Sequence, residues 1–192
     1  MEEKMNTRLL FLFLIVLFTL TPVMYAISNT AGSVEFTVTT KPTGEKYTPQ
    51  HALAIWVTDS KGNFIKTLKI QGQKTKFFLS TWMTKAKPSE INAVTGATLK
   101  AHQIHTVTWD CRDALGNLMP DGKYQIHVEF TEKNGQGPVT PSDYIRFTKG
   151  TKPLSLTFDD LTYFYKMELH YTPGDKSSPP VVENQNSEKR ID

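Results

Sequence analysis

The sequence predicts an all-β fold, namely an immunoglobulin-like two-layer antiparallel β-sandwich of about eight strands. We assign the sandwich to residues 33–172. Apolar and polar side chains alternate with a period of two in short segments along most of the chain, and no segment shows a long helical period. Turn-forming residues stand between these segments, as they do between the antiparallel strands of a sandwich.

The expected strands follow one another along this domain. The continuous apolar run at 53–57 predicts a strand covered on both faces, and turn residues at 59–62 join it to 64–70 as a hairpin. Amphipathic strands are expected at 34–38, 104–109, 124–130, 154–158 and 161–169, with a weaker candidate at 144–147. In the last stripe, side chains from Leu161 to Leu169 face the core at every second position. Residues 77–85 can form a short helix.

The two ends of the chain differ from the domain between them. Residues 1–26 resemble a secretory signal peptide, with Arg8, an apolar run and small residues at Ala26 and Ser28, after either of which cleavage can occur. The apolar run is shorter than the roughly 20 residues that a membrane span needs, and an uncleaved N-terminal anchor is the alternative. We therefore expect a periplasmic or secreted protein. Residues 173–192 are polar and rich in proline and serine, which predicts a disordered tail.

Charge and cysteine content exclude several classes of function. The net charge of +3 is small and spread along the chain, whereas nucleic-acid-binding proteins usually gather their basic residues in a stripe. We therefore expect no nucleic-acid partner. Cys111 is the only cysteine, so no intramolecular disulfide can form. No base stands near it in the sequence, which indicates an inert residue in a turn. We find no nucleophile elbow and no paired carboxylates, so an enzyme is not the favoured interpretation.

Residues 107–124 predict two strands joined by a double turn. Trp109 ends the first strand, Asp110 and Asp113 can accept backbone N–H bonds in the turn, and Tyr124 starts the next buried stripe. This stretch resembles the immunoglobulin-like domain of the flagellar hook-capping family, whose pattern is Trp-Asp-Gly-x-Asp, then Gly, then Pro-x-Gly-x-Tyr. Cys111 stands where that family usually has glycine.

A second resemblance covers most of the domain. Segments 48–59, 80–82, 93–98 and 109–124 occur in the order that is typical of a predicted periplasmic bacterial family, domain of unknown function 2271. The resemblance implies an exported bacterial protein, often found near membrane redox or metal-uptake components. It implies no particular activity.

The segment Thr95-Gly96-Ala97-Thr98 is the most specific candidate for chemistry. It resembles the acceptor motif of periplasmic flavin transferases, Asp-x-x-Ser/Thr-Gly-Ala-Thr, in which the last threonine carries FMN as a phosphoester. The resemblance implies covalent FMN on Thr98 and a flavin transferase as partner, with the cofactor supplying the redox chemistry. Asn92 stands at the aspartate position of the motif, and an unmodified surface turn is the alternative.

The histidines form the second candidate site. His102 and His105 are three residues apart, which on a strand would place them on opposite faces. His127 and His170 are expected on the solvent faces of their strands. No pair has the spacing of a metal site by itself, but the fold could bring His51 and His105 together as metal ligands.

Three interpretations of function follow. The sequence favours a non-catalytic periplasmic accessory or binding protein, associated with a membrane redox or metal-uptake system and with a membrane protein or redox protein as partner. The alternatives are an extracytoplasmic electron carrier with FMN on Thr98 and a periplasmic metal-binding protein. The fold alone does not decide among them.

Overall fold

The computed structural model describes residues 28–44, 49–72, 76–86, 94–132 and 141–174. In these ranges the chain forms nine strands and two short helices. Their order is β1 (Gly32–Thr40), β2 (His51–Asp59), β3 (Phe64–Gln71), η1 (Lys76–Phe78), α2 (Ser80–Lys85), β4 (Val94–Gly96), β5 (Ile104–Trp109), β6 (Gly122–Glu132), β7 (Ser142–Lys149), β8 (Leu154–Phe158) and β9 (Phe164–Pro173).

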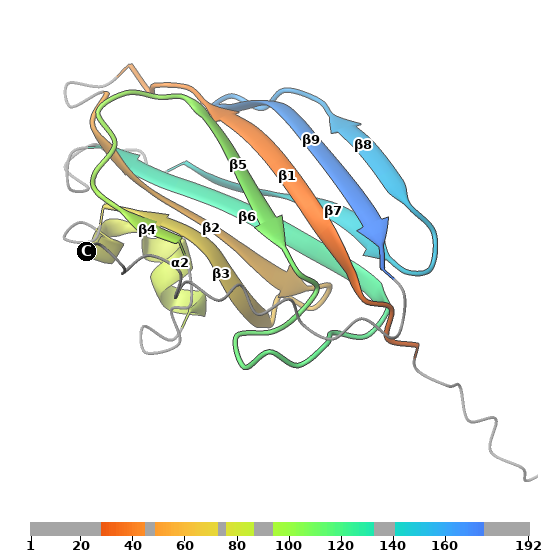
Figure 1. Cartoon of the computed structure of the whole chain (residues 1–192). Helices are drawn as coiled ribbons and strands as arrows, with labels where there is room; N and C mark the ends of the chain where they lie inside the picture. Colours follow the sequence, from red (N-terminus) through yellow and green to blue (C-terminus); the bar gives the residue numbers. More distant parts are fainter. Residues whose placement is uncertain (1–27, 45–48, 73–75, 87–93, 133–140, 175–192) are drawn as a thin grey trace, which may run out of the picture.

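The strands form two sheets that pack face to face (Figure 1). One sheet has the order β5-β1-β9-β8, and the other has the order β4-β3-β2-β6-β7. All paired strands are antiparallel except β3 and β4, which are parallel. The predicted all-β sandwich is confirmed. The short edge strand β4 is not among the strands expected from the sequence, since no alternation of side chains indicated it.

Strand β2 is covered on both faces, as its continuous apolar run predicts. Leu53 and Ile55 belong to the core between the sheets, whereas Ala54 and Trp56 belong to a second apolar cluster on the outer face. Trp82 of α2 completes this outer cluster. Burying a large apolar side chain is worth about 1.5–3 kcal/mol, so packing rather than helix propensity holds this six-residue helix.

Glu129 of β6 fixes the start of α2. Its carboxylate accepts hydrogen bonds from the backbone N–H groups of Thr81, at 2.9 Å, and Trp82, at 2.7 Å. The alternation along β6 places Glu129 on the outer face as predicted, but α2 buries it there completely. Burial raises the pKa of Glu129, although the two backbone donors oppose the rise. Helix α2 and the adjoining η1 therefore have a defined position over the sheet.

Strand β9 departs from the predicted pattern in its first half. Met167 and Leu169 are buried as expected, but Phe164 rather than Tyr165 faces the core before them. Lys166 has a φ of 50°, and the register of β9 against β1 shifts nearby. A β-bulge adds one residue to a strand and so reverses the alternation on one side of it. The stripe that begins at Leu161 therefore does not lie on one face.

Trp109 closes one end of the sandwich. It is fully buried, and its indole N–H donates to the carbonyl oxygen of Arg112 at 2.7 Å. Its ring lies 5.1 Å from that of Tyr124 and 6.2 Å from that of Phe147, measured between centroids. The hydroxyl of Tyr124 donates to the carbonyl oxygen of Pro120. These contacts fix the double turn to the core.

Two turns at this end share the pattern Asp-x-x-Gly-Asn, at 59–63 and 113–117. In each turn, one aspartate oxygen accepts two backbone N–H bonds and the other accepts the asparagine side chain. The glycines have φ of 83° and 87°, in the left-handed region that favours glycine. Slight burial acts to raise the pKa of Asp59 and Asp113, but the hydrogen bonds outweigh it and lower both.

No helix in the described ranges is long and apolar enough to cross a bilayer. Residues 1–26, the predicted signal peptide, lie outside those ranges, as does the predicted tail from residue 175 onward.

Candidate functional site

The segment Thr95–Thr98 lies at an exposed edge of the five-stranded sheet. β4 is the end strand, and it pairs with β3 through Ile70 opposite Thr95 and Gln71 opposite Gly96. Gly96 is half-buried, whereas Thr95, Ala97 and Thr98 are exposed. Thr98 therefore lies on the surface, where an enzyme can reach it.

After β4 the chain crosses from the edge of the sheet to the start of β2. Gly72 has a φ of 90° and turns the chain away from the sheet at the end of β3, and its N–H donates to the carbonyl oxygen of Gly96 at 2.9 Å. Leu99 then takes the place beside β2. Its backbone exchanges two hydrogen bonds with that of His51, at 3.0 and 2.9 Å. Thr98 is thus one residue away from a fixed pairing with a candidate histidine.

Three histidines meet at this end of the sandwich. His51 begins β2, His102 lies between β4 and β5, and His105 lies in β5. The rings of His51 and His102 are stacked with centroids 4.0 Å apart, and the ring of His105 stands at 84° to that of His51 at 6.4 Å. The fold therefore brings His51 and His105 together, and it adds His102.

The expectation that His102 and His105 lie on opposite sides is wrong. His102 precedes β5 instead of lying in it, so the alternation of a strand does not separate the two side chains. Its Nε2 lies 3.1 Å from Oε1 of Glu132, the last residue of β6. Glu132 also accepts hydrogen bonds from the N–H and the hydroxyl of Thr43. We call His51, His102, His105 and Glu132 the histidine cluster.

Burial determines the electrostatics of the histidine cluster. It lowers the pKa of His51 to about 4, with repulsion from His102 acting in the same direction. It lowers the pKa of His105 to about 3, helped by the charge of Lys69. The pKa of His102 is also lowered by burial, although Glu132 opposes the shift. The three imidazoles are therefore neutral at neutral pH.

Each of the three rings has a buried nitrogen without a hydrogen-bond partner: Nε2 of His51, Nδ1 of His102 and Nδ1 of His105. A neutral imidazole nitrogen is a common metal ligand. The planes of His51 and His102 are only 11° from parallel, however, so their in-plane lone pairs do not converge on one ion. In the described ranges, no three His, Cys, Asp or Glu side chains are arranged to hold a metal. Metal binding by His51 and His105 stays a prediction.

His127 lies in a second aromatic arrangement, on the outer face of the sheet. Its ring stacks on Trp56 at 4.9 Å and lies 5.0 Å from Tyr144, and Arg146 lies over the ring of Tyr144. Its Nε2 is 3.0 Å from Oγ1 of Thr58. His127 is half-buried instead of solvent-exposed, and burial lowers its pKa to about 4. Contacts of this kind stabilise neighbouring strands and indicate no chemistry.

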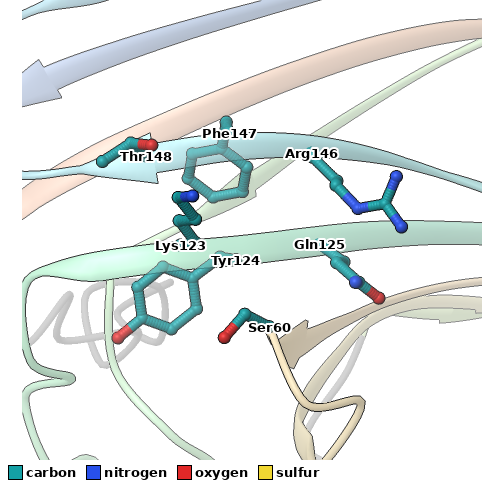
Figure 2. Close-up of a pocket in the computed structure, with 7 residues that line it drawn as sticks. All are labelled: Ser60, Lys123, Tyr124, Gln125, Arg146, Phe147 and Thr148. Carbon is teal, nitrogen blue, oxygen red and sulfur yellow. The ribbon is translucent and has the colours of Figure 1, made fainter.

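A cavity of about 440 Å³ lies over the ends of β6 and β7 (Figure 2). Its lining holds two cations and no carboxylate or imidazole: Ser60, Lys123, Tyr124, Gln125, Arg146, Phe147 and Thr148. It therefore offers no carboxylate or imidazole for general acid–base chemistry. It also lies far from Thr98 along the sheet, since Tyr124 pairs with the last residue of β2 and Leu99 with the first.

Cys111 has the properties of an inert residue. It is fully buried, and burial raises the pKa of its thiol to about 12, so that no thiolate is available at neutral pH. Its φ of 58° lies in the left-handed region, which explains why a related turn would use glycine at this position. The resemblance of the turn to hook-capping proteins stays a prediction.

Comparison with known proteins gives one match. A family described as predicted periplasmic protein, domain of unknown function 2271, matches residues 32–145. The chain belongs to this family. The region of the chain that matches this family of periplasmic proteins includes Thr95–Thr98, the histidine cluster and the double turn. No curated protein and no solved structure matches the chain.

His102 and Glu132 are the members of the cluster that the sequence did not indicate. They are 30 residues apart, so no local spacing could have predicted their contact. If the strand extended back to Gln103, this polar residue would share the core face with His105, and this is the sequence signal that the strand begins after His102.

Proposed function

We propose that this chain is an extracytoplasmic electron carrier that holds FMN as a phosphoester on Oγ1 of Thr98 and performs no catalysis of its own. The exposure of Thr98 beside an edge strand is the observation that supports the proposal. Membership of a family described as periplasmic supports it further, because flavin transferases of this type act in that compartment. The predicted signal peptide would take the chain there.

The residues around Thr98 fit the loading reaction. Oγ1 of Thr98 forms a bond to the phosphorus of the FMN half of FAD, the bond between the two phosphates breaks, and AMP leaves. A base of the transferase takes the hydroxyl proton. The exposed neighbours Thr95 and Ala97 leave the backbone accessible to that enzyme. Once bound, the isoalloxazine supplies electron transfer, and the chain positions it.

Expression in the periplasm together with a flavin transferase tests the proposal. We expect a band on a denaturing gel that fluoresces under blue light, and an intact mass raised by FMN less one water. Thr98→Ala should abolish both signals, whereas Thr98→Ser keeps a hydroxyl and should retain them. A dark wild-type band with the mass of the bare chain would contradict the carrier and favour an accessory protein without a cofactor.

Asn92 is the position at which the chain differs from the acceptor motif, and replacing it gives a second test of the proposal. The acceptor motif has aspartate at this position, and Asn92 lies outside the described residues. If the transferase reads that carboxylate, Asn92→Asp should increase the fraction of loaded protein at equal expression. The loaded fraction is measured from the intact mass spectrum. A lower fraction in Asn92→Asp would show that the motif is not read in the expected way.

A further inference from the structure

Two adjacent phenylalanines are exposed on η1. Phe77 is 63% exposed and Phe78 is 45% exposed, and the ammonium group of Lys76 lies 5.8 Å from the centre of the Phe77 ring. Exposed aromatic pairs are costly to keep in water and often mark a binding surface. We call Phe77 and Phe78 the aromatic platform.

The aromatic platform and Thr98 both adjoin residues that are held against β2. Leu79, which follows Phe78, packs in the same outer-face cluster as Ala52, and η1 contacts β2 directly. Ala52 follows His51, whose backbone is hydrogen-bonded to Leu99. Phe78 and Thr98 thus each adjoin a residue whose position is fixed relative to β2, Leu79 in the outer-face cluster and Leu99 by its backbone pairing. Figure 1 shows the short helices and β4 at the same end of the sandwich.

Thr98 and the aromatic platform are both accessible from solvent. Leu99 packs against the core between the sheets, whereas Thr98, which precedes it, is exposed. The outer face of the five-stranded sheet carries α2 and the adjoining η1, so the platform is exposed on that face.

We propose that the aromatic platform is the docking site for the isoalloxazine ring of the FMN attached to Thr98. The inference rests on the proposed function and adds a position for the flavin. Aromatic rings stack on flavins through flat apolar faces, as they do on one another. Lys76 places a positive charge beside the platform, which suits the anionic phosphoester and the negative charge of the reduced flavin. A docked flavin covers both phenylalanines and presents one edge to a redox partner.

The mobility of the attached flavin tests this position. The full chain is loaded in the periplasm, and the fluorescence anisotropy of the flavin and its quenching by iodide are measured. The variants are Phe77→Ser and Phe77→Ser/Phe78→Ser, with intact mass confirming equal loading and circular dichroism confirming the fold. Leu115→Ser is the matched control, because Leu115 is an 84% exposed apolar residue in the turn at 113–117.

We expect the wild type to show high anisotropy and weak quenching. Loss of one aromatic contact should lower the ratio of docked to undocked flavin by roughly two- to tenfold, and loss of both should lower it more. The control should match the wild type. Equal anisotropy and quenching in the wild type and the double variant, with loading intact, would overturn the docking site alone. Absence of loading overturns the carrier itself, and the docking site with it.

Discussion

The two ends of the sandwich differ in how their buried polar groups are satisfied. At the Trp109 end, the indole N–H of Trp109 and the ammonium group of Lys149 have close hydrogen-bond acceptors. At the His51 end, buried atoms without a partner gather. In the described ranges they belong to Thr39, His51, His102, His105 and Thr131, and only Trp56 adds one elsewhere. Such groups cost free energy, so we infer that the Trp109 end contributes more to stability than the His51 end does.

The largest expected effect is at Trp109. Replacing this fully buried residue by alanine removes its ring contacts and its hydrogen bond to Arg112. We expect Trp109→Ala to lower the free energy of unfolding by about 3–5 kcal/mol, measured by urea denaturation. Leu115→Ala, in the neighbouring exposed turn, should change it by less than about 0.5 kcal/mol. If Trp109→Ala lowered the free energy of unfolding by less than Leu115→Ala does, this end of the sandwich would not be a main source of stability.

The ion pair between Lys149 and Asp121 should give the next largest effect. The Lys149 side chain is fully buried, with Nζ 2.8 Å from Oδ1 of Asp121. Oδ1 also accepts the N–H of Thr30, and Oδ2 accepts its hydroxyl. Slight burial acts to raise the pKa of Asp121, but the bonds from Lys149 and Thr30 outweigh it and lower the pKa to about 2. Asp121→Ala leaves a buried cation unpaired and should cost about 3 kcal/mol in urea denaturation.

Lys149→Met is the comparison for this pair. It removes the buried charge, while Asp121 keeps its bonds from Thr30 and remains partly accessible to water. We therefore expect a loss of only about 1 kcal/mol, smaller than that of Asp121→Ala. Equal losses in the two variants would mean that the buried cation is not the costly partner.

The two ends were also predictable to different degrees. The double turn could be predicted, because the bonds of Asp113 to Leu115 and Asn117 connect residues close together in the chain. The full histidine cluster could not, although the approach of His51 and His105 was anticipated, because the cluster joins residues from β2, β5, β6 and a crossing segment. The bulge at Lys166 was hidden for another reason: a single left-handed residue reverses the face of a strand without changing its composition. Local spacing indicates turns and strands, but not where three-dimensional crossings place polar side chains.

Acid should destabilise the His51 end. The pKa of His51 is about 4 and that of His105 about 3, whereas both titrate near 6.5 in the unfolded chain. The unfolded chain therefore binds more protons below pH 6.5, and stability falls as the pH drops toward 4. We expect a loss of about 2 kcal/mol for each of the two histidines between pH 7 and pH 5. Urea midpoints measured across this range check the slope.

Single substitutions show which histidines cause this dependence of stability on pH. His105→Leu removes one buried imidazole and should reduce the loss of stability between pH 7 and pH 5 by about 2 kcal/mol, while Glu132 and Lys69 remain in place. His170 is the matched control, since its side chain is 53% exposed on β9, and His170→Gln should leave the slope unchanged. An unchanged slope in His105→Leu would place the acid sensitivity outside the histidine cluster.

The smallest expected effect is at the two matched turns. Asp59→Ala and Asp113→Ala each remove a carboxylate that accepts backbone N–H bonds, and each should cost about 1 kcal/mol in urea denaturation, as for an aspartate that caps a helix. Asparagine keeps an acceptor oxygen at either position and should restore most of the loss.

Because hydrogen bonding lowers the pKa of both aspartates, their contribution to stability is present above the ordinary pKa and disappears as the pH falls through the lowered pKa. This loss begins at a lower pH than that of the histidines, so the His51 end starts to lose stability first on acidification. A loss of stability on acidification that neither aspartate variant changes would mean that the turns add nothing to the stability of the Trp109 end.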